Sequence, residues 1–206
     1  MPVADTASPN GLLAAGGDLA PGTVLAAYRT GIFPWPDQMG RLLWWSPDPR
    51  AIIEIADFHE SRSLVRRRQS GRFTTSFDRA CAAVLDGCAD RAEGTWLNDE
   101  MKQSYLALYK LGWVHSVEVW QGARLVGGLY GVAIGGLFAA ESMFHRETDA
   151  SKVALAELVG RLRRSRLQLL DVQFLTPHLA SLGASEISRV AYLDRLAPAI
   201  ASAVRF

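Results

Sequence analysis

Hydrophobic residues in the second half of the chain recur at every second position. Three such runs, at residues 115–120, 125–134 and 137–143, are separated by the glycine-containing turns 121–123 and 135–136. Side chains of a strand alternate between its two faces, and glycine favours tight turns. The pattern therefore predicts an antiparallel meander of three strands.

Other segments repeat their hydrophobic residues with helical spacing. The clearest is 98–111, where Asn98 can cap the first turn and Gly112 can end the last. Residues 151–166 carry an apolar stripe that includes Leu155 and Leu162. Further helices are expected at 21–29, 58–69, 77–85 and 193–204.

A fourth strand is expected at 168–174, directly after the helix at 151–166. A strand–helix–strand connection within one sheet makes the last strand parallel to its neighbour. The residues before the meander are rich in proline and arginine instead. We therefore expect an α+β protein with one domain over 1–90 and a second over 91–206.

Composition limits the classes of protein that the chain can form. It has 206 residues, 49% of them hydrophobic and 21% charged, with a net charge of +1, so it can bury a core and is no polycation as a whole. The longest uncharged run, 125–140, is shorter than the ~20 residues of a membrane helix. Cys81 and Cys88 are interpreted as reduced thiols, and residues 1–5 lack the start of a signal peptide. These features favour a cytoplasmic protein that does not enter a membrane.

Two carboxylates interrupt the most apolar of these strands. Glu141 lies in the third strand, and Asp171 lies in the fourth beside Gln173. A carboxylate in apolar surroundings is costly unless it is paired, hydrogen-bonded or used in chemistry. If the two strands are neighbours, Glu141 faces Asp171 and Gln173, which share one face of their strand. Such a group can hold the proton of an amine, or it can be structural, with Glu141 paired to Arg146 or Lys152 and Asp171 paired to an arginine.

Tryptophans and clustered arginines leave two interpretations open. Trp44, Trp45 and Trp96 can stack on a nucleic-acid base or fill a core. The arginines can follow phosphates or form a solvated helix face. The glycines of 127–131 permit close approach of a ligand or another backbone, or reflect crowding by a packed aromatic ring. The two arginine clusters comprise Arg62, Arg66, Arg67, Arg68 and Arg72, and Arg161, Arg163, Arg164 and Arg166.

Motifs for metal or nucleotide chemistry are absent from the sequence. The four histidines are far apart, and neither a HExxH, a GxxxxGK[ST] nor a GxSxG motif occurs. We therefore expect neither a metal ion nor a cofactor.

Several short segments occur in the order found in one enzyme family. They include Tyr28-Arg-Thr-Gly-Ile-Phe-Pro-Trp35, Leu43-Trp-Trp-Ser-Pro-Asp-Pro-Arg50, His115-Ser-Val-Glu-Val-Trp120 and Glu141-Ser-Met-Phe144. From about residue 10 to about residue 195, the chain resembles the leucyl/phenylalanyl-tRNA–protein transferases.

The resemblance implies an aminoacyltransferase with a small N-terminal domain and a GNAT-like acyltransferase domain. Such an enzyme moves Leu or Phe, and less readily Met, from aminoacyl-tRNA to proteins that begin with Arg or Lys, which marks them for degradation. The ester is already activated, so neither ATP nor a metal is required. The implied partners are the aminoacyl-tRNA and the protein substrate, and we expect a monomer.

The resemblance also implies roles for individual residues. Gln173 would contact the attacking amine, Asp171 would polarise Gln173, and Glu141 would orient an amino group or hold the Arg or Lys end of the substrate. In an alternative, the tRNA ribose relays the proton and these residues only position the reactants.

Binding residues follow from the same resemblance. Trp96 and either Trp44 or Trp45 would embrace the terminal adenosine, with Ser142 also at the substrate. Leu129, where Met is familiar, and Phe138 would line the pocket for the transferred side chain. The tRNA would be bound by Arg62, Arg66, Arg67, Arg68, Arg161 and Arg164.

Two rival functions remain open at this point. An acetyl-CoA-dependent GNAT enzyme would need a glycine-containing pyrophosphate loop before the helix at 151–166, and residues 144–151 contain no glycine. A non-catalytic RNA-binding module would leave Glu141, Asp171 and Gln173 without a purpose.

Overall fold

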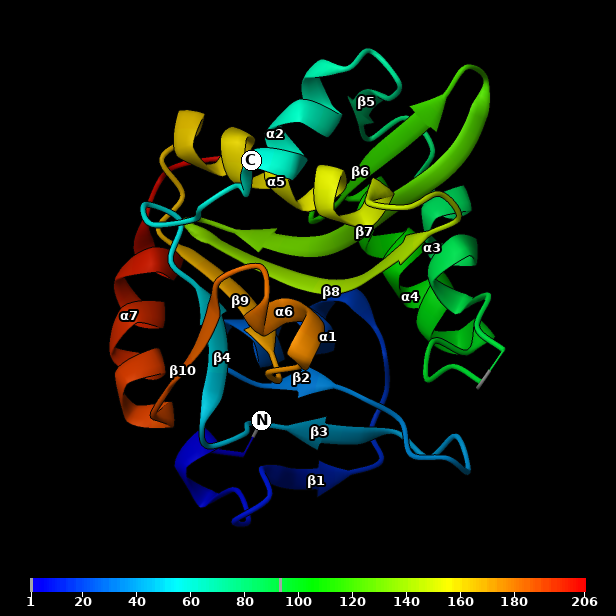
Figure 1. Ribbon diagram of the computed structural model, residues 1–206. Coiled ribbons are helices and arrows are strands. Elements are labelled where there is room, and N and C mark those ends of the chain that lie inside the picture. The colour runs from blue at the N-terminus through cyan, green and yellow to red at the C-terminus, as the bar shows by residue number, and fades with distance from the viewer. Residues whose placement is uncertain (1, 93) are drawn as a thin grey trace.

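Two β-sheets of unequal size organise the chain (Figure 1). The computed structural model describes residues 2–92 and 94–206, and within them a three-stranded sheet has the order β1-β3-β2 and a seven-stranded sheet the order β10-β4-β9-β8-β7-β6-β5. The small sheet consists of β1 (Leu12–Ala15), β2 (Phe33–Pro34) and β3 (Leu43–Trp45). The large sheet consists of β4 (Arg50–Ile53), β5 (Thr74–Phe77), β6 (Val114–Gln121), β7 (Arg124–Ile134), β8 (Leu137–His145), β9 (Leu169–Gln173) and β10 (Ala184–Ile187).

The meander and the parallel strand that follows it are confirmed. β6, β7 and β8 pair antiparallel in succession. Helix α5 (Ala150–Arg164) then returns the chain, so that β9 pairs with β8 in the parallel sense. The α+β class is confirmed with it.

The expected boundary near residue 90 does not coincide with a separation between the sheets. β4 and β5 both precede residue 90, yet both belong to the large sheet. Before residue 50, the chain forms the small sheet and α1 (Pro21–Arg29) instead. Two strands from residues 50–77 therefore share a sheet with strands of the second half of the chain.

The helix expected at 77–85 begins later than predicted. Residues Thr74–Phe77 form β5, which pairs with β6, and α3 begins only at Cys81 and ends at Ala89. The buried carboxylate of Glu118 accepts hydrogen bonds from the backbone N–H groups of Arg79 and Ala80 at the start of α3. Ser76, the expected cap, lies in the strand and donates to the same carboxylate. A partner 42 residues away thus decides where the helix begins.

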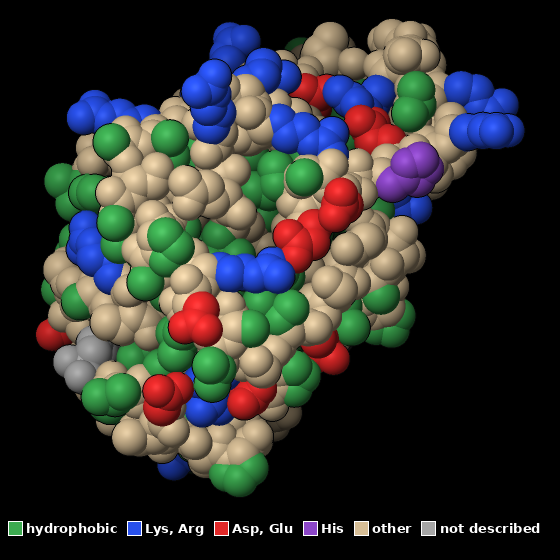
Figure 2. All heavy atoms as spheres, turned by 90° about the vertical axis from the view of Figure 1, so that its left-hand side faces the viewer, with side chains coloured by type: hydrophobic (Ala, Val, Ile, Leu, Met, Phe, Trp, Pro, Cys, Tyr) green, Lys and Arg blue, Asp and Glu red, His purple; other side chains and the backbone are tan. Residues whose placement is uncertain are grey.

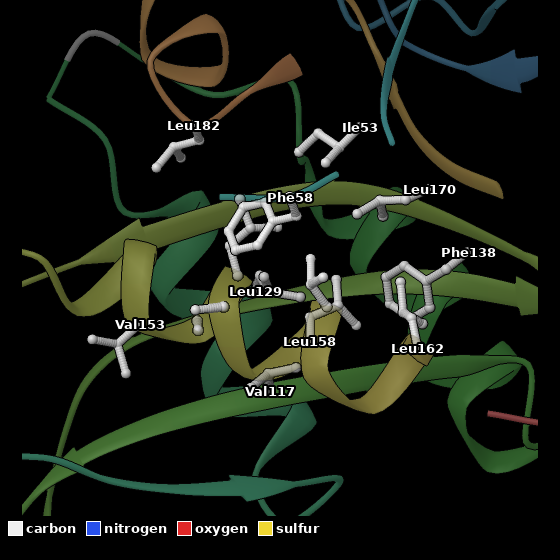
Figure 3. Packing of buried hydrophobic residues seen from close by; sticks show 14 of the residues in the cluster. Ile53, Phe58, Val117, Leu129, Phe138, Val153, Leu158, Leu162, Leu170 and Leu182 are labelled. Atoms are coloured by element: carbon white, nitrogen blue, oxygen red, sulfur yellow. The ribbon is translucent and has the colours of Figure 1, made fainter. Parts of the chain in front are cut away.

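Helices cover both faces of the large sheet. On one face α5 packs against β6 and β7, and α2 (Arg62–Gln69) packs on α5. Figure 3 shows Leu158 and Leu162 of α5 directed into this core with Val117 and Leu129. The other face is covered by α3 and α4 (Asp99–Lys110), and α1 packs on α4. The remaining helices are α6 (Pro177–Ala180) and α7 (Arg189–Ala201), which packs against β8 and β9. Among the described residues, none of these helices has the length and apolar content needed to cross a membrane.

Crowding explains the glycines of β7. A Cβ on Gly131 would overlap the carbonyl oxygen of Ala139 and the ring of Phe138, and a Cβ on Gly127 would lie 2.6 Å from that of Ala150. Neighbouring protein atoms, including the aromatic ring, therefore occupy the space that a side chain would need.

Candidate active site

The site lies where β8 and β9 part. Their parallel pairing ends at Ala139 and Asp171. Just beyond, β8 has one extra residue relative to β7, because Gly131 pairs with Ala140 but Tyr130 pairs with Ser142. The extra residue is Glu141. A β-bulge bends its strand and re-aims the side chain that it carries.

The other strand is irregular at the same level. Ile52 of β4 pairs with Asp171, but Ala51 pairs with Gln173, so Val172 is the extra residue of β9. Gln173 itself has a φ of 60°. Two bulges therefore face each other across the space between β8 and β9.

Glu141 and Gln173 meet across this gap, as the sequence predicted. The Gln173 Nε2 donates to Glu141 Oε1 at 3.1 Å. On its other side, Glu141 Oε2 accepts from the Tyr105 hydroxyl at 2.9 Å, and that hydroxyl lies 3.1 Å from the hydroxyl of Tyr28. α1 and α4 thus hold the carboxylate from behind, and Gln173 holds it from the front.

Burial makes the carboxyl group of Glu141 a weaker acid than usual. It raises the pKa of the carboxyl group from 4.5 to about 7, although the hydrogen bonds from Tyr28 and Tyr105 lower it. The charge of Asp171 raises the pKa further and that of Arg50 lowers it. Near neutral pH the group is therefore present in both protonation states, a property suited to proton transfer.

Asp171 adopts the paired arrangement that the sequence left open as the structural alternative. Its side chain is 0% exposed and accepts two hydrogen bonds from Arg50, at 2.8 Å from Nε and 2.6 Å from Nη2. The Tyr192 hydroxyl donates to the same carboxylate at 3.0 Å. Alternation had placed Asp171 and Gln173 on one face, but the bulge at Val172 intervenes. Val172 and Gln173 line the cavity described next, whereas Asp171 lies behind it.

A cavity of about 600 Å³ opens at the parted strands. Glu141 and Gln173 contribute polar groups to its wall. Its apolar wall includes Leu129, Ala140, Val172, Phe174 and Leu179. The cavity is also lined by aromatic, charged and polar side chains, namely Trp35, Trp96, Asp90, Arg91, Ser142, His145, Arg146, Ser151 and His178.

The tryptophans of the cavity differ in part from those expected. Trp96 lines it, with its ring 5.1 Å from that of Trp35 and tilted by 31°. Trp44 is buried and donates to the carbonyl of Gly16 at 2.8 Å. Trp45 donates to the carbonyl of Trp35 at 3.0 Å and so supports the wall from outside. Trp35 was not predicted, although its position between Pro34 and Pro36 was a signal for an extended surface segment.

Of the other expected binding residues, two line the cavity and one does not. Leu129 lines the cavity, and so does Ser142, which lies 3.2 Å from Arg91 Nη2. Phe138 does not line it. Its ring is fully buried 5.2 Å from that of Phe206 in the core drawn in Figure 3.

Half of the expected tRNA-binding arginines are occupied by other contacts. Arg67 pairs with Asp149 at 3.4 Å, and Arg68 pairs with Glu60 and Glu157. Arg161 lies over the rings of Phe77 and Phe206. Arg62, Arg66 and Arg164 are exposed and have no ion pair among the residues described.

We call Arg62, Arg66 and Arg164 the outer arginines. They belong to α2 and to the last turn of α5. Figure 2 shows basic side chains gathered at this upper end of the molecule, with acidic side chains mostly below. Within residues 2–92 and 94–206, no group of three or more His, Cys, Asp or Glu side chains is arranged to hold a metal ion.

Comparison with known proteins identifies the family. The model of the leucyl/phenylalanyl-tRNA protein transferase family matches residues 52–197, and the model of that family's N-terminal domain matches residues 17–48. The chain belongs to this family. It is therefore an aminoacyl-tRNA–protein transferase of the N-end rule type, with an aminoacyl-tRNA as donor and a protein as acceptor. Membership decides against the two rival functions that the sequence left open.

Relatives with the same name cover most of the chain. The transferase of Stutzerimonas stutzeri is 53% identical over 192 residues, which are 92% of this chain and 85% of the relative. That of an Anaeromyxobacter species is 48% identical over 204 residues, covering 97% of this chain and 87% of the relative. Among solved structures, a GCN5-related N-acetyltransferase from Kribbella flavida is similar with a TM-score of 0.43 and 12% identity, over 82% of this chain and 61% of that one.

Replacing Glu141 by glutamine tests the raised pKa of its carboxyl group. The folded wild type keeps the Glu141 proton up to about pH 7, whereas the unfolded chain releases it near 4.5. Between these values the folded state binds more protons, so its free energy of unfolding falls as the pH rises. We expect wild type to lose about 3 kcal/mol relative to E141Q between pH 4.5 and pH 8.

Urea unfolding of both proteins across this pH range measures the difference. Taking the difference between the two proteins cancels the titration of all other groups. A difference that stays constant with pH would contradict the raised pKa.

Proposed function

We propose that the cavity holds the 3′ end of a tRNA charged with Leu or Phe, and less readily Met, against the α-amine of a protein that begins with Arg or Lys. The observation that carries this proposal is the contact between Gln173 and Glu141 at the cavity wall. An amide and a carboxylate of intermediate acidity stand beside an apolar recess there. An attacking amine and a hydrophobic aminoacyl group require these two environments side by side.

The reaction needs positioning and one proton transfer. The amine nitrogen forms a bond to the ester carbonyl carbon, and the bond from that carbon to the tRNA ribose oxygen breaks. An α-amine has a pKa of about 7.7–8.0, so a useful fraction is neutral near pH 7. Its proton must finally reach the ribose oxygen. Ionised Glu141 can carry the proton or can hold the amine while the ribose oxygen takes it directly.

The apolar wall of the cavity favours a bulky apolar aminoacyl group. It is formed by Leu129, Ala140, Val172 and Leu179. An apolar pocket distinguishes side chains that differ by one methylene by only about 1–3 kcal/mol. Leu, Phe and Met are therefore all expected to bind, with different efficiencies. Leu129 has about the volume of Met, so we expect it to adjust the order of preference without ending activity.

The two ends of the substrates have separate candidate partners. The half-buried Trp35–Trp96 pair offers an indole face to the terminal adenine, and stacking of a base on an aromatic ring contributes about 1–3 kcal/mol. Asp90 and Glu141 both line the cavity and can attract the cationic side chain of an N-terminal Arg or Lys. The outer arginines can contact phosphates of the tRNA.

The setting of the reaction follows from its donor. We expect the enzyme to act as a monomer in the cytoplasm, where aminoacyl-tRNA is made, and its product to be degraded. The large exposed hydrophobic side chains include Val3, Met39, Leu111 and Val190. They lie in widely separated segments of the chain, which supports the monomer. Light scattering at micromolar concentration measures the mass directly.

Transfer of labelled leucine from Leu-tRNA to short peptides tests the proposal. We expect transfer to peptides that begin with Arg or Lys, and none to the same peptides after N-acetylation or to peptides that begin with Ala. Gln173→Ala should lower kcat about 100-fold, because the amine loses the group that positions it. Gln103→Ala, an exposed glutamine on α4, serves as the matched control. Equal transfer to every free N-terminus, or a Gln173→Ala variant as active as the control, would rule the proposal out.

Removing two outer arginines tests the tRNA contact. We expect Arg62→Ala with Arg66→Ala to weaken tRNA binding and to reduce the slope of log affinity against log salt by about two, since two phosphate contacts are lost. The control is Lys110→Ala with Arg195→Ala, which removes the same charge from α4 and α7. If both double variants bind tRNA alike at all salt concentrations, α2 is not part of the interface. Filter binding at salt concentrations from about 50 to about 300 mM measures the slope, because affinity for tRNA changes strongly over this range.

A further inference from the structure

The backbone of Gln173 is held in an unfavourable conformation. Its φ of 60° lies in the left-handed region, which costs a residue with a side chain on the order of 1–2 kcal/mol. Such a conformation persists only where neighbouring groups enforce it. It occurs at the residue whose amide reaches Glu141 across the cavity.

The Asp171 carboxylate is hydrogen-bonded directly to this backbone. Asp171 Oδ1 accepts the backbone N–H of Gln173 at 3.0 Å. The same oxygen accepts Arg50 Nε at 2.8 Å, and Oδ2 accepts both Arg50 Nη2 and the Tyr192 hydroxyl. Four donors thus surround one carboxylate that is 0% exposed. Its oxygens accept these bonds, and Asp171 does not line the cavity.

Arg50 is itself fixed from several directions. Its guanidinium lies between the rings of Phe33 and Tyr192, 4.6 and 4.5 Å from their centroids. Its Nη1 donates to the carbonyl of Gly31 at 3.1 Å, in the turn after α1. The side chain is 1% exposed. It therefore joins the small N-terminal sheet, β4, β9 and α7 at one point.

We propose that Arg50 and Tyr192 are positioning residues for transfer: they fix the Asp171 carboxylate, which in turn holds the Gln173 backbone so that the Gln173 side chain faces the attacking amine. This inference rests on the proposed role of Gln173. It replaces the expected polarisation of Gln173 by Asp171 with a geometric role. Neither Arg50 nor Tyr192 lines the cavity, so both act only through Asp171 and Gln173.

The role predicts a particular kinetic signature. Losing one bond to Asp171 frees the Gln173 backbone, which lowers kcat but leaves the apolar wall and the tryptophans, and hence KM for aminoacyl-tRNA, nearly unchanged. A purely structural role would lower the amount of folded enzyme, but it would not lower kcat selectively while KM stays unchanged. The effect must also vanish once the Gln173 amide is absent.

A double-mutant cycle between Tyr192→Phe and Gln173→Ala tests the inference, with the labelled-leucine assay as readout. Tyr192→Phe keeps the ring against Arg50 and removes one hydroxyl. We expect it to lower kcat about tenfold with KM changed less than about twofold. In the Gln173→Ala background the same change should lower kcat by less than about twofold. The matched control is Tyr130→Phe, since that buried hydroxyl has no hydrogen-bond partner among the described residues.

The outcomes separate this inference from the proposed function. If Gln173→Ala leaves kcat unchanged, the proposed role of Gln173 fails and the inference fails with it. If Gln173→Ala lowers kcat but Tyr192→Phe acts equally in both backgrounds, or acts no more than Tyr130→Phe, only the inference is overturned. Arg50→Lys, which keeps the charge but not the two parallel hydrogen bonds, is the second variant and should show the same dependence on Gln173.

Discussion

β8 and β9 stop pairing at Ala139 and Asp171, and the site depends on this parting. Up to these residues, the side chains of both strands are buried in the core. Beyond it, a bulge in each strand turns a polar side chain toward the gap, and Glu141 and Gln173 meet there. The cavity, the raised pKa of Glu141 and the apolar recess all follow from strands that separate while still covered by helices. A regular sheet would close this space with backbone hydrogen bonds.

A buried ion pair keeps the parted strands in one arrangement. Removing charges from water is costly, and the Arg50–Asp171 pair is tolerated because four donors reach the Asp171 carboxylate and Arg50 also donates to the carbonyl of Gly31. Breaking such a pair by deleting one partner costs several kcal/mol, so Asp171→Ala would affect folding as well as turnover. Arg50 is the first residue of β4, directly after the segment that links the two sheets. The family's N-terminal part is thereby connected to the geometry of the transfer site.

Local periodicity predicted the elements that depend on local order. The meander, α5 and β9 were predicted because period two and period 3.6 are visible along the chain. Asn98 was predicted as a cap from its residue type and position, and its side chain does accept the N–H of Met101. β4 and β10 were missed, since a four-residue strand shows no period until its partner is known. Arg50 was missed for the same reason: Asp171 lies 121 residues away. Alternation placed Asp171 and Gln173 on one face, and no residue type in the sequence indicated the bulge at Val172.

The most direct measurement is a crystal structure with an amide-linked analogue of 3′-leucyl-adenosine, which cannot be cleaved by the enzyme. The account predicts the leucyl side chain against Leu129 and Ala140, the adenine on Trp96, and the carbonyl group beside Gln173 and Glu141. An analogue bound outside this cavity, or bound within it with its carbonyl group turned away from both Gln173 and Glu141, would contradict the account.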